Sequence, residues 1–480
     1  MIATQKKYSR RNIDLTEGPI LAKFIKFVLP LMATNFLQTF YNAADMMVVS
    51  MSSEPNAVGA IGATGSLTTL IINLFMGFSV GTNILVARYL GAKDHEKVNK
   101  IIHTSVIMSM LFGLITAFVG LFASRTILTM MGADGNLLDL ATLYTKIYFC
   151  GAPFLAATNY LSAIFRAKGD TKTPLMVLSA TGLVNVGLNV LFVLVFGMSV
   201  DGVAVATAAA NLISAATLIY LLSKDEGPCH FSFKSLCLDG KSFGGIVKEG
   251  LPAGIQGSLF SFSSLMIQSS IFNVNTALVG VGSEYAPVIN GTSAMSNLDH
   301  FINTAVNAGY QASITFTSQN YGAKKYKRIK KVILVATLLS MAIGIIGGVI
   351  IVIFRNPLLS LYGIKNGVEG SMEALAYKSA MMRMTCMTTT YALLGFMNTG
   401  TGAMRGLGKT LTSTVISLIG ACLFRIAWVY VVVGFLSILT PFPTLALIYA
   451  AFPVTWIITG IAQYASAYSF LNKKIAESAQ

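Results

Sequence analysis

Twelve separate apolar runs make up most of this 480-residue chain, each close to the ~20 residues that a helix needs to cross a bilayer. Only 11% of the residues are charged, whereas roughly a quarter are charged in a soluble domain. In lipid every backbone polar group needs an internal partner, so runs of this length are expected to form helices. The expected spans are 27–50, 57–82, 101–124, 138–158, 174–196, 200–222, 250–273, 286–315, 331–354, 378–399, 412–435 and 443–469. The sequence therefore predicts an all-α polytopic membrane protein with twelve transmembrane helices.

The basic residues alternate between the two sides of this arrangement. With the N-terminus placed in the cytoplasm, 27 of the 34 Lys and Arg fall on the cytoplasmic side and three fall in outer loops. This asymmetry is the usual orientation signal of membrane proteins. It predicts a multi-pass protein of the inner (plasma) membrane with both termini cytoplasmic. It also accounts for the net charge of +15 without a nucleic-acid partner.

Three landmarks recur in the same order in the two halves of the chain. Leu29–Pro30 returns as Leu251–Pro252, the segment 83–98 returns as 314–329, and the segment 165–174 returns as 403–412. Six spans per half mean that both halves start on the same side, so the repeats are parallel. The predicted organisation is a cytoplasmic arm (1–26), a six-helix bundle (27–222), a cytoplasmic linker (223–249), a second six-helix bundle (250–471) and a cytoplasmic tail (472–480).

A polar face runs along the first expected span. Its residues, three, four and three positions apart, are Asn35, Gln38, Asn42 and Asp45. A carboxylate inside hydrocarbon is costly, and such residues typically mark an ion or proton pathway. We therefore favour a coupling role for Asp45; the alternative is a structural aspartate held permanently by neighbouring amides.

Taken together and in order, the motifs of this chain resemble those of the MATE (multidrug and toxic compound extrusion) family of bacterial efflux transporters. The resemblance extends from Leu29 to about Leu471 and includes QTFYNAADMMVVS, GTNILVARYLGAKD, FRAKGDTKTP, the N-x3-N of VNVGLNVLF, GLPAGIQ, SQNYGAKKYKR, MRGLGKT and FRIAW. It implies a V-shaped pair of bundles and alternating access. It also implies secondary active antiport, in which cationic or amphipathic drugs or toxic compounds leave the cell in exchange for H+ or Na+.

The resemblance further implies a cation or proton site in the N-terminal bundle. By motif position this site consists of Asp45, Tyr144, Asn185, Asn189 and Thr207. Position 189 is often an aspartate in the family, so this chain keeps a single carboxylate there. Oxygen ligands suit Na+ and a carboxylate also suits H+, so the coupling ion stays open. No other cofactor or metal is expected beyond Na+ at Asp45, Asn185 and Asn189.

The eighth expected span is the most polar one. Its polar residues occupy two faces, which cannot both meet lipid, so we expect this helix to line the central cleft. Asp299 on this span has two interpretations: a second protonation or substrate-charge site, or an ion pair with Arg383 or Lys378 on the tenth span. The full set of candidates for substrate contact is Asn35, Gln38, Asn42, Gln256, Asn297, Asp299, His300, Arg383 and Met387.

No enzyme is predicted from the loops. GAMRGLGKT (402–410) resembles a phosphate-binding loop, but Ala403 replaces its first glycine and no strand precedes it. The five cysteines show no CxxC spacing, which argues against disulfides and structural zinc. The expected partners are small-molecule substrates and the lipid bilayer, and the chain is expected to be monomeric. Two alternatives remain: an exporter or flippase of a lipid-linked precursor or metabolite from the same superfamily, and a membrane sensor without transport.

Overall fold

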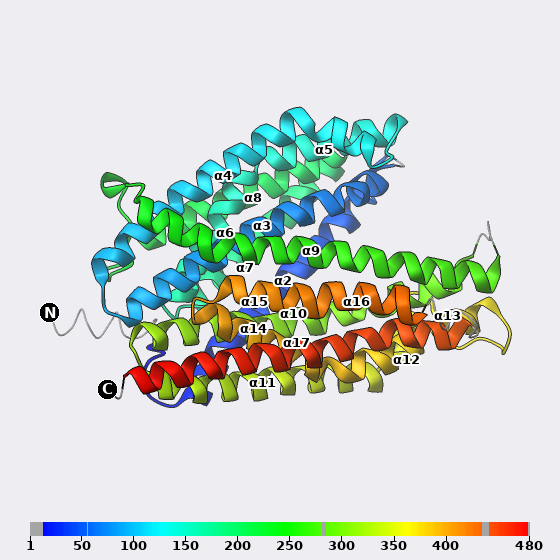
Figure 1. Cartoon of the computed structure of the whole chain (residues 1–480). Helices are drawn as coiled ribbons and strands as arrows, with labels where there is room; N and C mark the ends of the chain where they lie inside the picture. Colours follow the sequence, from blue (N-terminus) through cyan, green and yellow to red (C-terminus); the bar gives the residue numbers. More distant parts are fainter. Residues whose placement is uncertain (1–12, 55, 281–284, 434–440, 479–480) are drawn as a thin grey trace. The chain divides into compact units, whose positions relative to one another are not determined.

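The computed structural model describes residues 13–54, 56–280, 285–433 and 441–478, and within these ranges it contains helices and no strand (Figure 1). Residues 1–12 of the expected N-terminal arm and residues 479–480 of the expected tail lie outside the described ranges. The chain divides into two compact units. The first comprises Met1–Gly257 with Ser318–Lys325, and the second comprises Ser258–Thr317 with Tyr326–Gln480.

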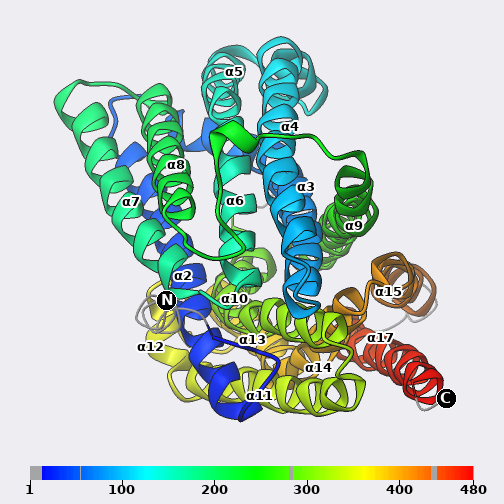
Figure 2. The same cartoon turned by 90° about the vertical axis from the view of Figure 1, so that its left-hand side faces the viewer.

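The first unit is a bundle built on the N-terminal half of the chain. Its elements are α2 (Ile20–Val49), α3 (Ala57–Gly91), α4 (His95–Met130), α5 (Gly135–Cys150), α6 (Ala152–Ala167), α7 (Lys172–Val190), η1 (Leu191–Val195), α8 (Val200–Ser223), η2 (Phe233–Ser235) and the beginning of α9 (Gly240–Val279). Within it α7 packs against α2 and α8, while α4 packs against α5 and α6 (Figure 2).

The second unit repeats this pattern with more breaks. It contains the rest of α9, most of α10 (Pro287–Gly322), α11 (Tyr326–Ile353), α12 (Arg355–Ser360), α13 (Met372–Cys386), η3 (Thr388–Thr390), α14 (Tyr391–Gly406), α15 (Thr410–Ser417), η4 (Leu418–Leu423), α16 (Phe424–Ala427), η5 (Trp428–Val433) and α17 (Pro441–Glu477). Here α14 packs against both α11 and α17.

Over its described residues, each of the twelve expected spans coincides with one helix or with consecutive helical segments, which confirms the all-α polytopic fold. Residues 434–435 of the eleventh span lie outside the described ranges. Among the described residues, eight helices are long and apolar enough to cross a membrane, and the pair α5 and α6 makes a ninth. That pair is bent by 48° at Gly151, so the fourth span is not the single straight helix that its apolar run indicates. Several helices also extend past their apolar runs; α3 continues from the expected end at residue 82 to Gly91, and residues 83–87 of this extension are buried.

The backbone confirms the internal repeat within the segments that recur in the sequence. The non-glycine residues with positive φ in the described chain are Lys93 (59°) and Lys324 (56°), and they lie 231 residues apart. Gly169 (88°) and Gly408 (74°) are 239 residues apart. A left-handed conformation costs a residue with a Cβ about 1–2 kcal/mol. The same strained turn therefore follows the second helix of each repeat.

Two glycines at equivalent positions of the repeat let the ends of α3 and α10 pack closely within the first unit. A Cβ on Gly91 would lie 1.9 Å from the carbonyl oxygen of Gln319, and a Cβ on Gly322 would lie 1.8 Å from that of Arg88. Any larger side chain at either position would force the backbones apart. This reciprocal contact is why the end of α10 belongs to the first unit although its sequence belongs to the second repeat.

Candidate ion-coupling site

The contact between α2 and α7 sets the position of Asp45. The hydroxyl of Tyr41 donates a hydrogen bond of 3.0 Å to the carbonyl oxygen of Ser179. Gly182 makes room for the same ring, since a Cβ there would lie 1.9 Å from a Tyr41 ring carbon. Asp45 follows Tyr41 by about one turn on the same face of α2, so it reaches the amides farther along α7.

A chain of hydrogen bonds joins α2, α7 and α8 at this point. Asn189 donates through Nδ2 to Oδ1 of Asp45 at 2.5 Å, and the same Nδ2 lies 3.5 Å from Oδ1 of Asn185. Asn185 in turn donates to Oγ1 of Thr207 at 3.4 Å. Both asparagines are buried, and Asp45 and Thr207 are half-buried. Four of the five residues expected at the site therefore lie together.

Tyr144, the fifth expected residue, is buried on α5 in a hydrophobic cluster that also contains Val48 of α2 and Val203 of α8. Tyr148, one turn farther along α5, packs against the same cluster, and its ring stacks on that of Tyr144 with a centroid distance of 5.7 Å. Sequence reasoning missed Tyr148. The signal that identifies it is the four-residue spacing, which puts both tyrosines on one face of α5.

The chemistry of the site fits a small cation or a proton. Asp45 supplies the negative charge, and the side-chain oxygens of Asn185, Asn189 and Thr207 supply neutral ligands. Oδ1 of Asn189 is buried and accepts no hydrogen bond from the described residues. A buried acceptor without a donor is costly. Na+ would satisfy it directly, as the preference of hard cations for oxygen ligands predicts.

The other three residues of the polar face differ in exposure: Asn35 is half-buried, and Gln38 and Asn42 are exposed. Asp45 is the residue of this face that accepts the hydrogen bond from Asn189 of α7. The role of the other three as substrate contacts stays a prediction.

The second unit contains a different polar cluster, centred on α10 and α13. Oδ2 of Asp299 lies 2.9 Å from Nε of Arg383, and Oδ1 accepts a hydrogen bond of 2.7 Å from Thr388. The guanidinium of Arg383 also lies 5.5 Å from the ring centroid of Tyr449. Lys378 instead lies over the ring of Phe442, 4.3 Å from its centroid. Of the alternatives that the sequence left open for Asp299, the ion pair with Arg383 is the arrangement in the structure.

The remaining cleft candidates occupy varied environments. Asn297 and His300 are exposed on α10, and Gln256 is buried on α9 in the part that belongs to the first unit. Met387 is buried in the hydrophobic core of the second unit, between α13 and η3. Contact of these residues with a substrate stays a prediction.

The comparisons with known proteins agree with this organisation. The model of the MatE family matches residues 30–191 and 261–431, one segment in each repeat. A probable multidrug resistance protein of Bacillus subtilis, YoeA, is 28% identical over 461 residues and covers 93% of each chain. A probable multidrug resistance protein of Thermotoga maritima, NorM, is 24% identical over 430 residues, which cover 87% of each chain.

Solved structures show the same fold. The chain matches an outward-facing multidrug resistance MATE family transporter of the MOP superfamily with a TM-score of 0.85 at 19% identity, covering 97% of this chain and 99% of that one. It matches a MOP superfamily transporter from Pyrococcus furiosus with a TM-score of 0.84, also at 19% identity, covering 96% and 98% of the two chains.

Proposed function

This chain belongs to the MatE family, whose members are transporters and not enzymes, and we propose that it is a secondary active efflux antiporter. It exports cationic or amphipathic small molecules, including drugs, in exchange for H+ or Na+. The observation that carries this proposal is Asp45, an intramembrane carboxylate whose hydrogen-bond partner is the neutral amide of Asn189. The curated relatives named as multidrug resistance and export proteins support the substrate class.

The coupling step follows from the charge of Asp45. In its ionised form the carboxylate accepts the amide hydrogen of Asn189 and holds α2 against α7. Uptake of H+ or Na+ neutralises the carboxylate and removes the charge from this hydrogen bond, which weakens it by about half. Occupancy therefore changes the relative stability of two arrangements of α2 and α7, and an ion shifts such an equilibrium only through its different affinity for the two states.

Substrate would bind in a central cleft, and alternating access would release it on the outer side of the inner membrane. We place both termini in the cytoplasm because the Lys and Arg residues concentrate in alternate loops. The protein acts as a monomer in this proposal, with the lipid bilayer as its surroundings.

The experiment that tests the proposal is efflux of a fluorescent lipophilic cation from proteoliposomes that contain the full chain. A Na+ gradient and a pH gradient are imposed separately, with valinomycin and K+ to hold the membrane potential at zero. Antiport predicts efflux under at least one of the two gradients and collapse when nigericin or monensin dissipates it. Transport that proceeds equally without either gradient would exclude antiport and favour the exporter or flippase alternative. No transport under either gradient would instead favour a membrane sensor.

A further inference from the structure

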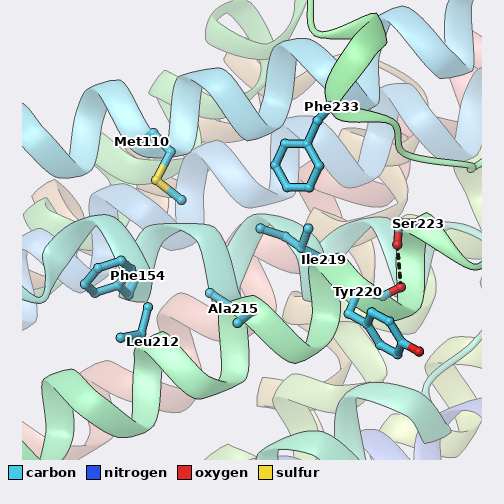
Figure 3. Close-up of a pocket in the computed structure, with 9 residues that line it drawn as sticks. Met110, Phe154, Leu212, Ala215, Ile219, Tyr220, Ser223 and Phe233 are labelled. Carbon is cyan, nitrogen blue, oxygen red and sulfur yellow. Dashed lines mark hydrogen bonds between the residues drawn. The ribbon is translucent and has the colours of Figure 1, made fainter.

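The first unit contains an apolar groove between α4, α6 and α8 (Figure 3). It has a volume of about 350 Å³, at the lower end of the range for pockets that bind small molecules. Its lining residues are Met110, Phe154, Leu212, Ala215, Ala216, Ile219, Tyr220, Ser223 and Phe233. Along α8 the groove extends from Leu212 to Ser223, which lie about 8 Å and about 24 Å along the helix from Thr207 of the ion-coupling site.

Small side chains on α8 create the space. Ala215 and Ala216 lie where the neighbouring positions carry larger residues such as Leu212 and Ile219. The groove is lined almost entirely by carbon, and two of its lining residues on α8, Tyr220 and Ser223, carry hydroxyls. The Ser223 hydroxyl donates a hydrogen bond of 2.8 Å to the carbonyl oxygen of Tyr220, and the Tyr220 hydroxyl points away from the other labelled side chains (Figure 3). An occupant therefore needs no hydrogen-bonding groups inside the groove.

The linker closes one end of the groove and is itself held firmly. Nε2 of His103 on α4 lies 3.1 Å from both the backbone nitrogen and the carbonyl oxygen of Ser232. The ring of Phe231 stacks on His103 with a centroid distance of 5.1 Å. These contacts fix η2, so that Phe233 forms a wall of the groove although it belongs to a loop between two spans (Figure 3).

Basic residues surround this same end. Lys224 directly follows α8, is exposed, and lies 5.8 Å from the ring centroid of Tyr220, which lines the groove. Lys234 directly follows Phe233 and is also exposed. The neighbouring Asp225 pairs with Lys168 at 2.7 Å. Glu226 is exposed, and within the described ranges it forms no ion pair with Lys224 or Lys234.

We propose that this groove binds one acyl chain of an anionic glycerophospholipid, with the headgroup phosphate held by Lys224 and Lys234. The apolar walls suit a hydrocarbon chain, and α4 and α8 are both helices of membrane-spanning length and hydropathy. The lysines at the headgroup end select a negative charge and disfavour a lipophilic cation. Attraction of an anionic headgroup by two lysines near a membrane surface corresponds to a preference of about 30-fold over a zwitterionic lipid.

The test is native mass spectrometry of the delipidated full-length protein, titrated with phosphatidylglycerol or phosphatidylcholine of identical acyl chains. Wild type should bind one phosphatidylglycerol about 30-fold more tightly than one phosphatidylcholine. Ala216→Phe fills the groove from an exposed position and should weaken both lipids at least 10-fold. The double variant Lys224→Gln/Lys234→Gln should bring phosphatidylglycerol down to the affinity of phosphatidylcholine.

Matched controls separate the groove from the rest of the surface. Ile213→Phe enlarges an exposed α8 residue outside the groove, and Lys473→Gln removes an exposed lysine at the end of α17; both should bind lipid like wild type. Phe233→Ala tests the same wall from the linker side if Ala216→Phe lowers the melting temperature. Unchanged lipid binding in both groove variants would overturn the proposal, as would equal affinity of wild type for the two lipids. Displacement of the lipid by tetraphenylphosphonium would also overturn it and assign the groove to a transport substrate.

Discussion

Both units hold an aspartate inside a membrane helix, and the two carboxylates have opposite kinds of partner. In the first unit Asp45 accepts a hydrogen bond from the neutral amide of Asn189. In the second unit Asp299 lies 2.9 Å from the guanidinium of Arg383 and also accepts a hydrogen bond from Thr388. The first cluster carries a net charge of −1 when Asp45 is ionised, whereas the charges of the second cancel.

This difference indicates a division of labour between the repeats. A carboxylate with neutral partners gains stability from a proton or a metal cation, so it is suited to bind and release one during a transport cycle. A carboxylate already paired with arginine gains nothing from a second cation, and breaking the pair leaves an uncompensated buried charge. We therefore expect the Asp45 cluster to control transport and the Asp299 cluster to control stability.

Asp45→Asn should have the largest effect on transport. The asparagine keeps an oxygen that accepts the hydrogen bond from Asn189, but it has no charge with which to bind H+ or Na+. Gradient-driven efflux should fall to the level of liposomes without protein, while the melting temperature in detergent stays within a few degrees of wild type. Efflux and melting temperature are measured on the same preparation.

Asp139→Asn is the matched control, because Asp139 is exposed and pairs with Arg125 at the surface. An exposed pair of this kind contributes at most about 1 kcal/mol, so efflux should be unchanged. Drug efflux that survives in Asp45→Asn would contradict the assignment of coupling to the first unit.

Arg383→Met should have the largest effect on stability. Removing the guanidinium leaves the Asp299 carboxylate buried without a counter-charge, which typically costs about 3–5 kcal/mol. Thermal unfolding in micelles should show the loss. The double variant Arg383→Met/Asp299→Leu should recover most of it, because replacing a buried pair by apolar residues is often neutral. If the double variant is no more stable than Arg383→Met, the stability lost in Arg383→Met does not come from the unpaired charge of Asp299 alone.

The sequence predicted the first cluster better than the second. Asp45 was identifiable from its helical spacing and its motif position, and Asn185, Asn189 and Thr207 from the motif positions of the resemblance. The structure joins all four by hydrogen bonds. The partner of Asp299 was not predictable in the same way. Arg383 and Lys378 lie five residues apart on one helix, and which of them faces α10 depends on packing that no local pattern encodes.

The breaks in the helices were also beyond the reach of the sequence. Gly151 ends α5 where a Cβ would lie 2.8 Å from that of Ala208, so the bend reflects the approach of α8. The break between α13 and α14 falls at Thr388, the residue that bonds to Asp299. Both breaks lie inside apolar stretches, for which the hydropathy pattern predicts continuous helices.

Asn189→Ala should have an intermediate effect on transport. It removes the amide that donates to Asp45 and the buried Oδ1 that would ligate Na+. A hydrogen bond to a charged group contributes about 1.5–3 kcal/mol, which corresponds to roughly a 10- to 100-fold change in affinity. The concentration of the coupling ion that gives half-maximal efflux should shift by that factor, while the maximal rate of efflux changes less. Asn189→Asp adds a second carboxylate, so for Na+ it should shift this half-maximal concentration in the opposite direction. A shift in the same direction in both variants would show that Asn189 is not part of the coupling site.

Thr388→Val should have the smallest effect. It tests, in the second unit, whether the Asp299 cluster acts only on stability. The change keeps the shape of the side chain but removes the hydrogen bond to Asp299. Because Arg383 still neutralises the carboxylate, we expect a loss of about 1.5 kcal/mol in the free energy of unfolding and no loss of efflux. Thr389→Val is the neighbouring control, since Thr389 is exposed and donates only to the carbonyl oxygen of Thr385. A Thr388→Val protein that is stable but does not transport would mean that the second unit takes part in coupling, and the division of labour between the two aspartates would fail.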